Sequence, residues 1–144
     1  MRPTAFATSR LLPALGLWFV ATSCTAMEPD APPAGAILMS PPAQYATWYA
    51  STEACAQIAG AAGRIEWYVV PGVSTFDTSI GEKVGLWERV GNVSRITIAG
   101  NYTDNEMVVR HEMLHDLLER AGHPPEYFVT RCHLTWDSWN AGEQ

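Results

Sequence analysis

Basic residues are scarce in this chain. Nine of its 144 residues are Lys or Arg, against 15 Asp or Glu, and Lys83 is the single lysine. If the N-terminal segment that carries Arg2 and Arg10 is removed, seven basic residues remain and the net charge is about −8. A protein that binds nucleic acid neutralises phosphates with clustered Lys and Arg. The composition therefore argues against a nucleic acid as a partner.

The N-terminal apolar run, Leu11 to Val20, is too short to span a membrane, which takes about 20 residues. Arg2 and Arg10 precede this run, and small residues follow it. A basic start, a short apolar centre and small residues are typical of a signal peptide. The sequence therefore predicts an exported protein, with residues 1–24 as the signal peptide.

Cys24 directly follows the small residues, which resembles the processing site of bacterial lipoproteins, although Ala21 stands where Leu is usual. We expect a lipid on Cys24 that anchors the protein to a membrane of the cell envelope, facing the periplasm or the exterior. The alternative is plain secretory cleavage near Ala26, which would leave no anchor.

Only three cysteines are present, and no two of them have the Cys-x-x-Cys spacing of a cysteine-rich zinc site. With Cys24 lipidated or cleaved off, Cys55 and Cys132 remain as one pair. An oxidising compartment favours a disulfide between them. In the chain-entropy model, a bridge over so long a loop stabilises a fold by up to about 4.5 kcal/mol.

Proline is concentrated near the N-terminus, with five of the ten prolines in residues 25–43. Together with Ala and Gly they predict an extended tether. Residues 44–144 are then expected to form one domain around a single core that includes most Trp and Tyr side chains.

Hydrophobic periodicity and turn residues predict an α+β fold. Four elements are expected first, namely a helix over residues 45–62 and strands over residues 64–70, 84–90 and 93–99. A second helix should begin at a capping box formed by Thr103 and Glu106 and should end at Gly122. The strands would form a short antiparallel or mixed sheet.

The second predicted helix contains His111-Glu112-Met113-Leu114-His115, an HExxH motif. Side chains four residues apart lie one turn above each other, so both imidazoles can reach one metal ion at about 2.0 to 2.1 Å. Glu112 is placed to accept a proton from water that the metal activates. The motif predicts a hydrolytic zinc site with Glu112 as general base, and the alternative is a chance match on a surface helix.

A catalytic zinc ion needs a third protein ligand. His123 is our candidate, because it lies eight residues after His115, beyond the predicted helix end. The helix would have to end early, since each residue rises about 1.5 Å. Another interpretation of His123 is a solvent-facing helix cap. Competing ligands are Asp116, Glu119, Glu126, His133 and Asp137.

The run from Val108 to His115, followed by Gly122-His123-Pro124-Pro125-Glu126-Tyr127-Phe128, resembles the zincin metallopeptidases. It is most similar to the small minigluzincin and SprT-like groups, in which a third His and then an aromatic residue follow HExxH. Leu118 stands where metzincins have Gly, position 121 is not His, and no Met-turn is recognisable. These departures argue against the metzincin subgroup.

The resemblance implies a zincin-like fold with an HExxH active-site helix, a Zn²⁺ ion held by His111, His115 and His123, and Glu112 as general base. The implied activity is zinc-dependent hydrolysis of peptide bonds in the cell envelope, on a peptide or protein substrate. Two alternatives stay open. One is a non-catalytic envelope binding protein with this fold, and the other is a zinc amidase that acts on cell-wall peptides.

Two further roles follow from the chemistry of such a site. Tyr127 is a possible electrophile for the developing oxyanion, with Tyr102 and His133 as alternatives. The segment from Ile96 to Gly100 precedes the active helix, and we expect it to make backbone contacts with an extended substrate.

Overall fold

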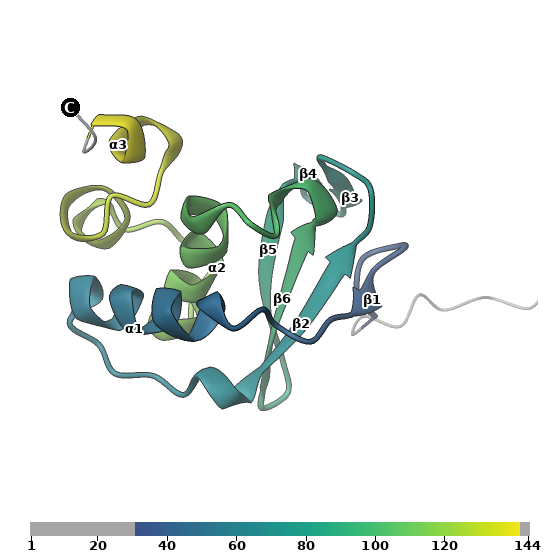
Figure 1. The fold of residues 1–144 in the computed structure, drawn as a ribbon, viewed down its shortest axis with the longest axis horizontal. Coiled ribbons are helices and arrows are strands. Elements are labelled where there is room, and N and C mark those ends of the chain that lie inside the picture. Colours follow the sequence, from purple (N-terminus) through teal and green to yellow (C-terminus); the bar gives the residue numbers. More distant parts are fainter. Residues whose placement is uncertain (1–30, 142–144) are drawn as a thin grey trace, which may run out of the picture.

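The computed structural model describes residues 31–141. They form a mixed α+β fold, as predicted (Figure 1). The helices are α1 (Gln44–Ala56), α2 (Glu106–Leu118) and α3 (Trp136–Ala141), with a π-helical segment at Glu126–Arg131. The strands are β1 (Ile37–Leu38), β2 (Ile65–Val70), β3 (Phe76–Thr78), β4 (Gly81–Lys83), β5 (Gly85–Val90) and β6 (Val93–Ala99). The predicted signal peptide, with Cys24, lies outside the described residues.

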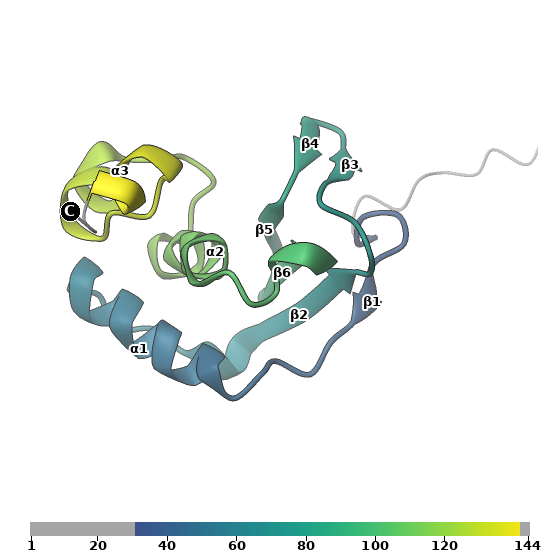
Figure 2. The ribbon, with the colours of Figure 1, turned by 45° about the horizontal axis from the view of Figure 1, so that its top comes forward.

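Helix α2 is the centre of the fold. It packs against α1 on one side and against β5 and β6 on the other, and α3 lies on the side of α2 away from the sheet (Figure 2). Because neighbours cover it on both sides, nine of the 13 residues of α2 are buried and the other four are half-buried. Its apolar contribution to the core comes from Met107, Val108, Val109, Met113, Leu114 and Leu117. The HExxH motif is therefore in the interior of the domain.

The main sheet is mixed, with the strand order β1-β2-β6-β5. Strand β6 pairs with β2 in parallel and with β5 antiparallel, along its whole length. Its residues Ser94–Ala99 are all buried, so β6 is covered on both faces rather than one. The expectation that Ile96–Gly100 contacts a substrate backbone is therefore wrong for the strand residues, since both edges of β6 are already hydrogen-bonded. The edge strand beside α2 is β5.

Helix α2 begins and ends at residues other than those predicted. Asn105 caps the N-terminus, where its side chain accepts a hydrogen bond of 3.0 Å from Val108 N–H. The capping box at Thr103 is wrong, because the Thr103 hydroxyl donates to the Gly100 carbonyl instead. At the other end, Glu119 adopts a left-handed conformation with φ of 50° and stops the helix at Leu118. The helix thus ends before Gly122, which shortens the path from His115 to His123.

Helix α1 also ends early, because Gln57 is left-handed with φ of 58°. Just before this end, Cys55 forms a disulfide with Cys132, and their Cα atoms lie 5.1 Å apart. The predicted pairing is confirmed. The bridge attaches the end of α1 to the residue that follows the π-helical segment.

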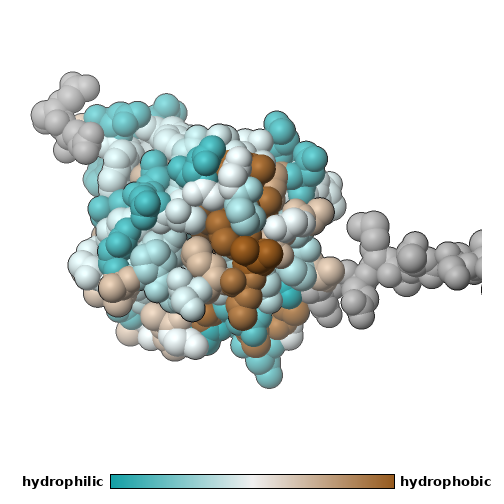
Figure 3. Space-filling model, turned by 45° about the vertical axis from the view of Figure 1, so that its right-hand side comes forward, coloured by the Kyte–Doolittle hydropathy of each residue, from teal (hydrophilic) through white to brown (hydrophobic). Residues whose placement is uncertain are grey.

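Strand β1 lies within the proline-rich segment 25–43 and pairs antiparallel with β2. The sheet therefore begins before Gln44. Ile37 and Leu38 are exposed, and so is Ile80 in the β3–β4 turn. On the side of the molecule that carries these elements, apolar side chains gather in a band (Figure 3). None of the helices within residues 31–141 has the length and apolar character needed to cross a membrane.

Candidate metal centre

Three imidazoles converge at the C-terminal half of α2. His111 and His115 project from one face of the helix, and His123 approaches from the loop that follows. The Nε2 atom of His123 lies 3.0 Å from Nε2 of His111 and 3.2 Å from Nε2 of His115. One ligand atom from each of the three residues lies within 4.8 Å of the others, so the group could hold a metal ion.

Backbone carbonyls fix which nitrogen faces the centre. His111 Nδ1 lies 2.6 Å from the carbonyl oxygen of Leu134, and His115 Nδ1 lies 2.8 Å from that of Arg120. A carbonyl oxygen only accepts hydrogen bonds, so each Nδ1 carries the proton and donates. Each Nε2 therefore carries no proton, and its lone pair is directed at the centre. An imidazole held by a second hydrogen bond in this way is typical of metal ligands.

The two known distances between the nitrogens are close to those of a tetrahedral metal site such as that of zinc. Two Nε2 lone pairs face a third imidazole nitrogen, and the single proton that His123 Nε2 can carry satisfies only one of them. A cation between the rings would satisfy all three. In tetrahedral coordination with Zn–N bonds of about 2.0 to 2.1 Å, neighbouring nitrogens are roughly 3.3 Å apart. The observed distances of 3.0 and 3.2 Å are close to that value.

Three of the four carboxylates that compete as third ligand are engaged in ion pairs, and the fourth, Asp137, is exposed on α3. Buried Asp116 accepts a hydrogen bond of 3.2 Å from Arg64, and Arg64 also pairs with Glu119 at 2.9 Å. Glu126 pairs with Arg131 at 2.6 Å. His123 is therefore the residue that the fold brings to the HExxH imidazoles.

Phe128 packs against all three imidazoles. Its ring centroid lies 4.8 Å from those of His111 and His115, and 4.9 Å from that of His123. Burial lowers the pKa of His115 to about 4, and it also lowers the pKa values of His111 and His123. Because the imidazoles are neutral at neutral pH, their nitrogens are free to bind a metal.

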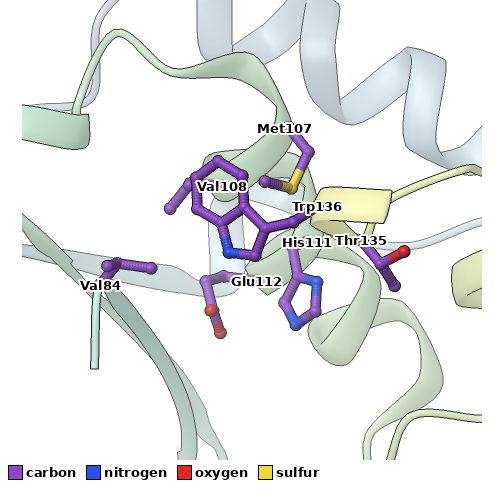
Figure 4. Close-up of a pocket in the computed structure, with 7 residues that line it drawn as sticks. All are labelled: Val84, Met107, Val108, His111, Glu112, Thr135 and Trp136. Carbon is purple, nitrogen blue, oxygen red and sulfur yellow. The ribbon is translucent and has the colours of Figure 1, made fainter. Parts of the chain in front are cut away.

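Glu112 is buried on the same helix, where its carboxylate accepts a hydrogen bond from the Trp87 backbone N–H. Burial raises its pKa to about 8, partly opposed by that hydrogen bond and by the charge of Lys83. Gly85 on β5 leaves the space for it, since a Cβ at Gly85 would lie 2.6 Å from Glu112 Oε1. Glu112 and His111 line one cavity (Figure 4).

Other residues considered from the sequence take different places. The Tyr127 ring stacks with the guanidinium of Arg131, so Phe128 is the aromatic at the imidazoles. His133 is exposed and adopts φ of 53°. Tyr102 packs edge-on against Trp136, which lines the cavity beside Glu112.

Three contributors to the centre carried little signal in the sequence, and a fourth, Phe128, could not be distinguished from Tyr127 as the aromatic residue that follows HExxH. Leu134 and Arg120 act through backbone carbonyls, which every residue has. Gly85 acts by having no side chain, and Phe128 was one of two adjacent aromatic candidates. A glycine at the start of an apolar strand is a weak indication of close approach, and only the fold shows what approaches it.

Comparison of the chain with protein-family models, with curated proteins and with solved structures finds no match, so the function has to be argued from this centre.

Proposed function

We propose that this protein is a zinc-dependent hydrolase of peptide bonds, built on a zincin-like fold. One observation carries the proposal. Three imidazole nitrogens converge on one point, and a buried carboxylate, Glu112, lies between two of the ligands on the same helix. A carboxylate beside metal ligands often orients them, but here the imidazoles of His111 and His115 donate to backbone carbonyls, so Glu112 is left for the role of proton acceptor that a hydrolase needs.

In this proposal His111, His115 and His123 hold the zinc ion. When bound, zinc would polarise a substrate carbonyl and make water acidic enough to attack near neutral pH. Glu112 would accept a proton at its carboxylate and deliver it to the leaving amine. The Trp87 N–H keeps this carboxylate oriented, and the carbonyls of Leu134 and Arg120 keep the imidazoles oriented.

Strand β5 is the place that we propose for the substrate backbone. It pairs with β6 on one side only. A groove of about 870 Å³ is lined by Leu86, Trp87 and Glu88 of β5, by residues 77–80 of β3 and the turn after it, by residues 31–34 and by Ala121 in the loop before His123. An extended peptide can add to such a strand through backbone hydrogen bonds.

We also propose that the protein works outside the cytosol, in the cell envelope. The Cys55–Cys132 disulfide supports this location, because such bridges persist in oxidising compartments. Lipidation at Cys24 would hold the domain at a membrane. Membrane fractionation of cells that make Cys24→Ser tests the anchor, and release of this variant from the membrane is the expected result.

The proposal is tested by measuring zinc content and cleavage on the same samples. Wild type should bind one zinc ion per chain and cleave unfolded proteins. Glu112→Gln should keep zinc and lose at least about 10²-fold in turnover, the contribution of a positioned acid-base group. His115→Ala should lose metal and activity together. Glu66→Gln, the same isosteric change at an exposed position, is the control.

Three results would contradict the proposal. A zinc content well below one ion per chain, which added zinc does not raise, would contradict the metal site. Full activity in Glu112→Gln would remove the mechanism. Tight zinc binding without any cleavage would favour a binding protein with this fold. Cell-wall peptides belong in the same assay, since cleavage of these alone would indicate an amidase.

A further inference from the structure

We propose that the folded domain itself contacts a lipid bilayer through its apolar face, formed by Ile37, Leu38 and Ile80, and that this contact fixes the orientation of the domain at the membrane. The inference rests on the membrane location that we propose for the protein. It adds a second contact with the same membrane, independent of the lipid on Cys24. It does not depend on the metal centre.

The three side chains of the apolar face are largely open to solvent. Ile37 is 55% exposed, Leu38 69% and Ile80 71%. Among the described residues, two other large apolar side chains are exposed, Val129 and Trp136, and neither lies on this side of the molecule. Exposed apolar residues that occur singly need no explanation, but several gathered on one side indicate contact with an apolar partner.

A small apolar cluster connects the strand that carries Ile37 with the hairpin that carries Ile80. Its members are buried Val70, Phe76 and Ala99 and half-buried Ala36, Val73 and Leu86. Ala36 directly precedes β1, and Phe76 is the first residue of β3. The half-buried members expose part of their surface between the two sites, and an apolar band is visible on this side (Figure 3). The apolar face is therefore one surface rather than two isolated spots.

Ile80 lies at the tip of the tight β3–β4 turn, a position where polar residues are usual. The Thr78 hydroxyl accepts a hydrogen bond of 3.2 Å from Ile80 N–H and donates one of 2.6 Å to the Gly81 carbonyl. These polar groups of the tip are thus satisfied within the turn, so they can enter the headgroup region at low cost. An apolar side chain on such a tip is suited to insertion into the boundary between headgroups and acyl chains.

The chain enters the domain on the same side. Ala31, the first described residue, lines one groove together with Ile80, and Ile37 follows six positions later. Cys24 is seven positions before Ala31, and seven residues span at most about 25 Å. A compact domain of this size has a diameter of roughly 34 Å. A lipid on Cys24 would therefore keep the apolar face close to the bilayer, at a high effective concentration.

The charges near the apolar face favour a bilayer over a second copy of the chain. Asp77 and Glu82 on either side of Ile80 are exposed, and residues 76–82 contain no Lys or Arg. Two copies placed face to face would bring these like charges together. Three side chains also offer much less area than the roughly 800 Å² per partner of a standard interface. Contact with a bilayer needs only apolar insertion, so it should not require anionic lipid.

The first test measures the orientation of the lipidated protein in phosphatidylcholine vesicles that contain a nitroxide-labelled phosphatidylcholine. A fluorophore is attached at Ile80→Cys, since Cys24 is lipidated and Cys55 is bridged to Cys132. Val129→Cys is the matched control, an exposed apolar position in the π-helical segment at the other end of the molecule from β1 (Figure 1). Quenching at Ile80→Cys should be at least about 3-fold stronger than at Val129→Cys. Equal quenching at the two positions would overturn the inference.

The second test measures the affinity of the face without the anchor, in the Cys24→Ser chain, by flotation with phosphatidylcholine vesicles. Changing Ile37, Leu38 and Ile80 together to Thr should lower the vesicle-bound fraction at least about 10-fold, because apolar area is lost while the β-branched replacement suits a strand. Val129→Thr should leave it unchanged. Adding phosphatidylglycerol should not raise binding. An unchanged bound fraction in the triple variant would overturn the inference, and so would a dimer in solution that the triple variant abolishes.

The two tests separate this inference from the proposed anchor. If mass measurement finds no lipid on Cys24, the proposed anchor fails, but vesicle binding that depends on Ile37, Leu38 and Ile80 still supports the apolar face. If Cys24 is lipidated while Ile80→Cys and Val129→Cys are quenched alike, the anchor holds and the inference fails. Urea unfolding of the triple variant checks that its fold is retained, and the single substitution Ile80→Cys gives the orientation even if it is not.

Discussion

Gly85→Ala should disturb the candidate general base without touching a metal ligand. An ideal Cβ at Gly85 would lie 2.6 Å from Glu112 Oε1, 2.8 Å from Cγ and 3.0 Å from Cδ. Carbon atoms in contact prefer about 3.5 to 4.0 Å, so the carboxylate has to move by roughly 1 Å. It has little room, because both residues are buried and the carboxylate is hydrogen-bonded to Trp87.

Two effects are expected from this change. Overpacking of this kind costs typically about 1 to 3 kcal/mol of stability. A displacement of about 1 Å in a catalytic group costs on the order of 10²-fold in turnover. Zinc affinity should stay near that of wild type, since the three heavy atoms nearest to the new methyl group all belong to Glu112 and none to an imidazole.

The assay combines urea unfolding, zinc content and peptide cleavage. Gly63→Ala is the matched control, because a Cβ at Gly63 meets no atom within 4 Å. Adding Gly85→Ala to Glu112→Ala should cost much less stability than adding it to wild type, since the clashing side chain is gone. The reasoning is refuted if Gly85→Ala unfolds at the same urea concentration as wild type, or if its cost persists in the Glu112→Ala background.

Three further expectations concern the metal ligands, pH and the disulfide. His123→Ala should weaken zinc binding at least about 100-fold by competition with a chelator, whereas His133→Ala should not, and equal affinities would reopen the choice of third ligand. In the metal-free protein the pKa of Glu112 is raised to about 8 from the ordinary 4.5, so the folded state holds this proton more tightly than the unfolded state does. The free energy of unfolding therefore falls as pH rises from 4.5 to 8. Metal-free Glu112→Gln should therefore gain about 3 kcal/mol relative to wild type between pH 5 and pH 8 in urea unfolding, and a constant difference would show that the carboxylate ionises freely. Cys55 and Cys132 should resist alkylation until reduced, as read by mass, and two reactive thiols in the native protein would disprove the bridge.

The sequence predicts those parts of the centre that depend on side-chain identity at fixed spacing. His111 and His115 are one helical turn apart with Glu112 next to His111, and the pairing of Cys55 with Cys132 follows from counting cysteines. The strand that became β6 was recognisable from its β-branched residues. In each case the prediction needs only the residues of one segment or the number of cysteines in the chain.

The remaining features depend on which elements become neighbours. Periodicity does not give the order of strands, so it did not show that β6 is central and β5 lies at the edge. The short β3–β4 hairpin has three-residue strands, too short for an alternation to be visible. The end of α2 was missed because Glu119, a poor residue for a left-handed conformation, is held there by ion pairs to Arg64 and Arg89.

The three imidazoles lie close together in the chain as well as in space. His115 and His123 are separated by 8 positions and His111 and His123 by 12, whereas the disulfide joins residues 77 positions apart. Closing a loop of n residues costs a free energy of about (3/2)RT ln n through lost chain entropy. Bringing His115 and His123 together therefore costs about 2 kcal/mol less than closing the disulfide ring. Gathering the imidazoles requires only one helix and the turn after it. If the chain is exported, as we propose, its three imidazoles can therefore come together before its cysteines have met.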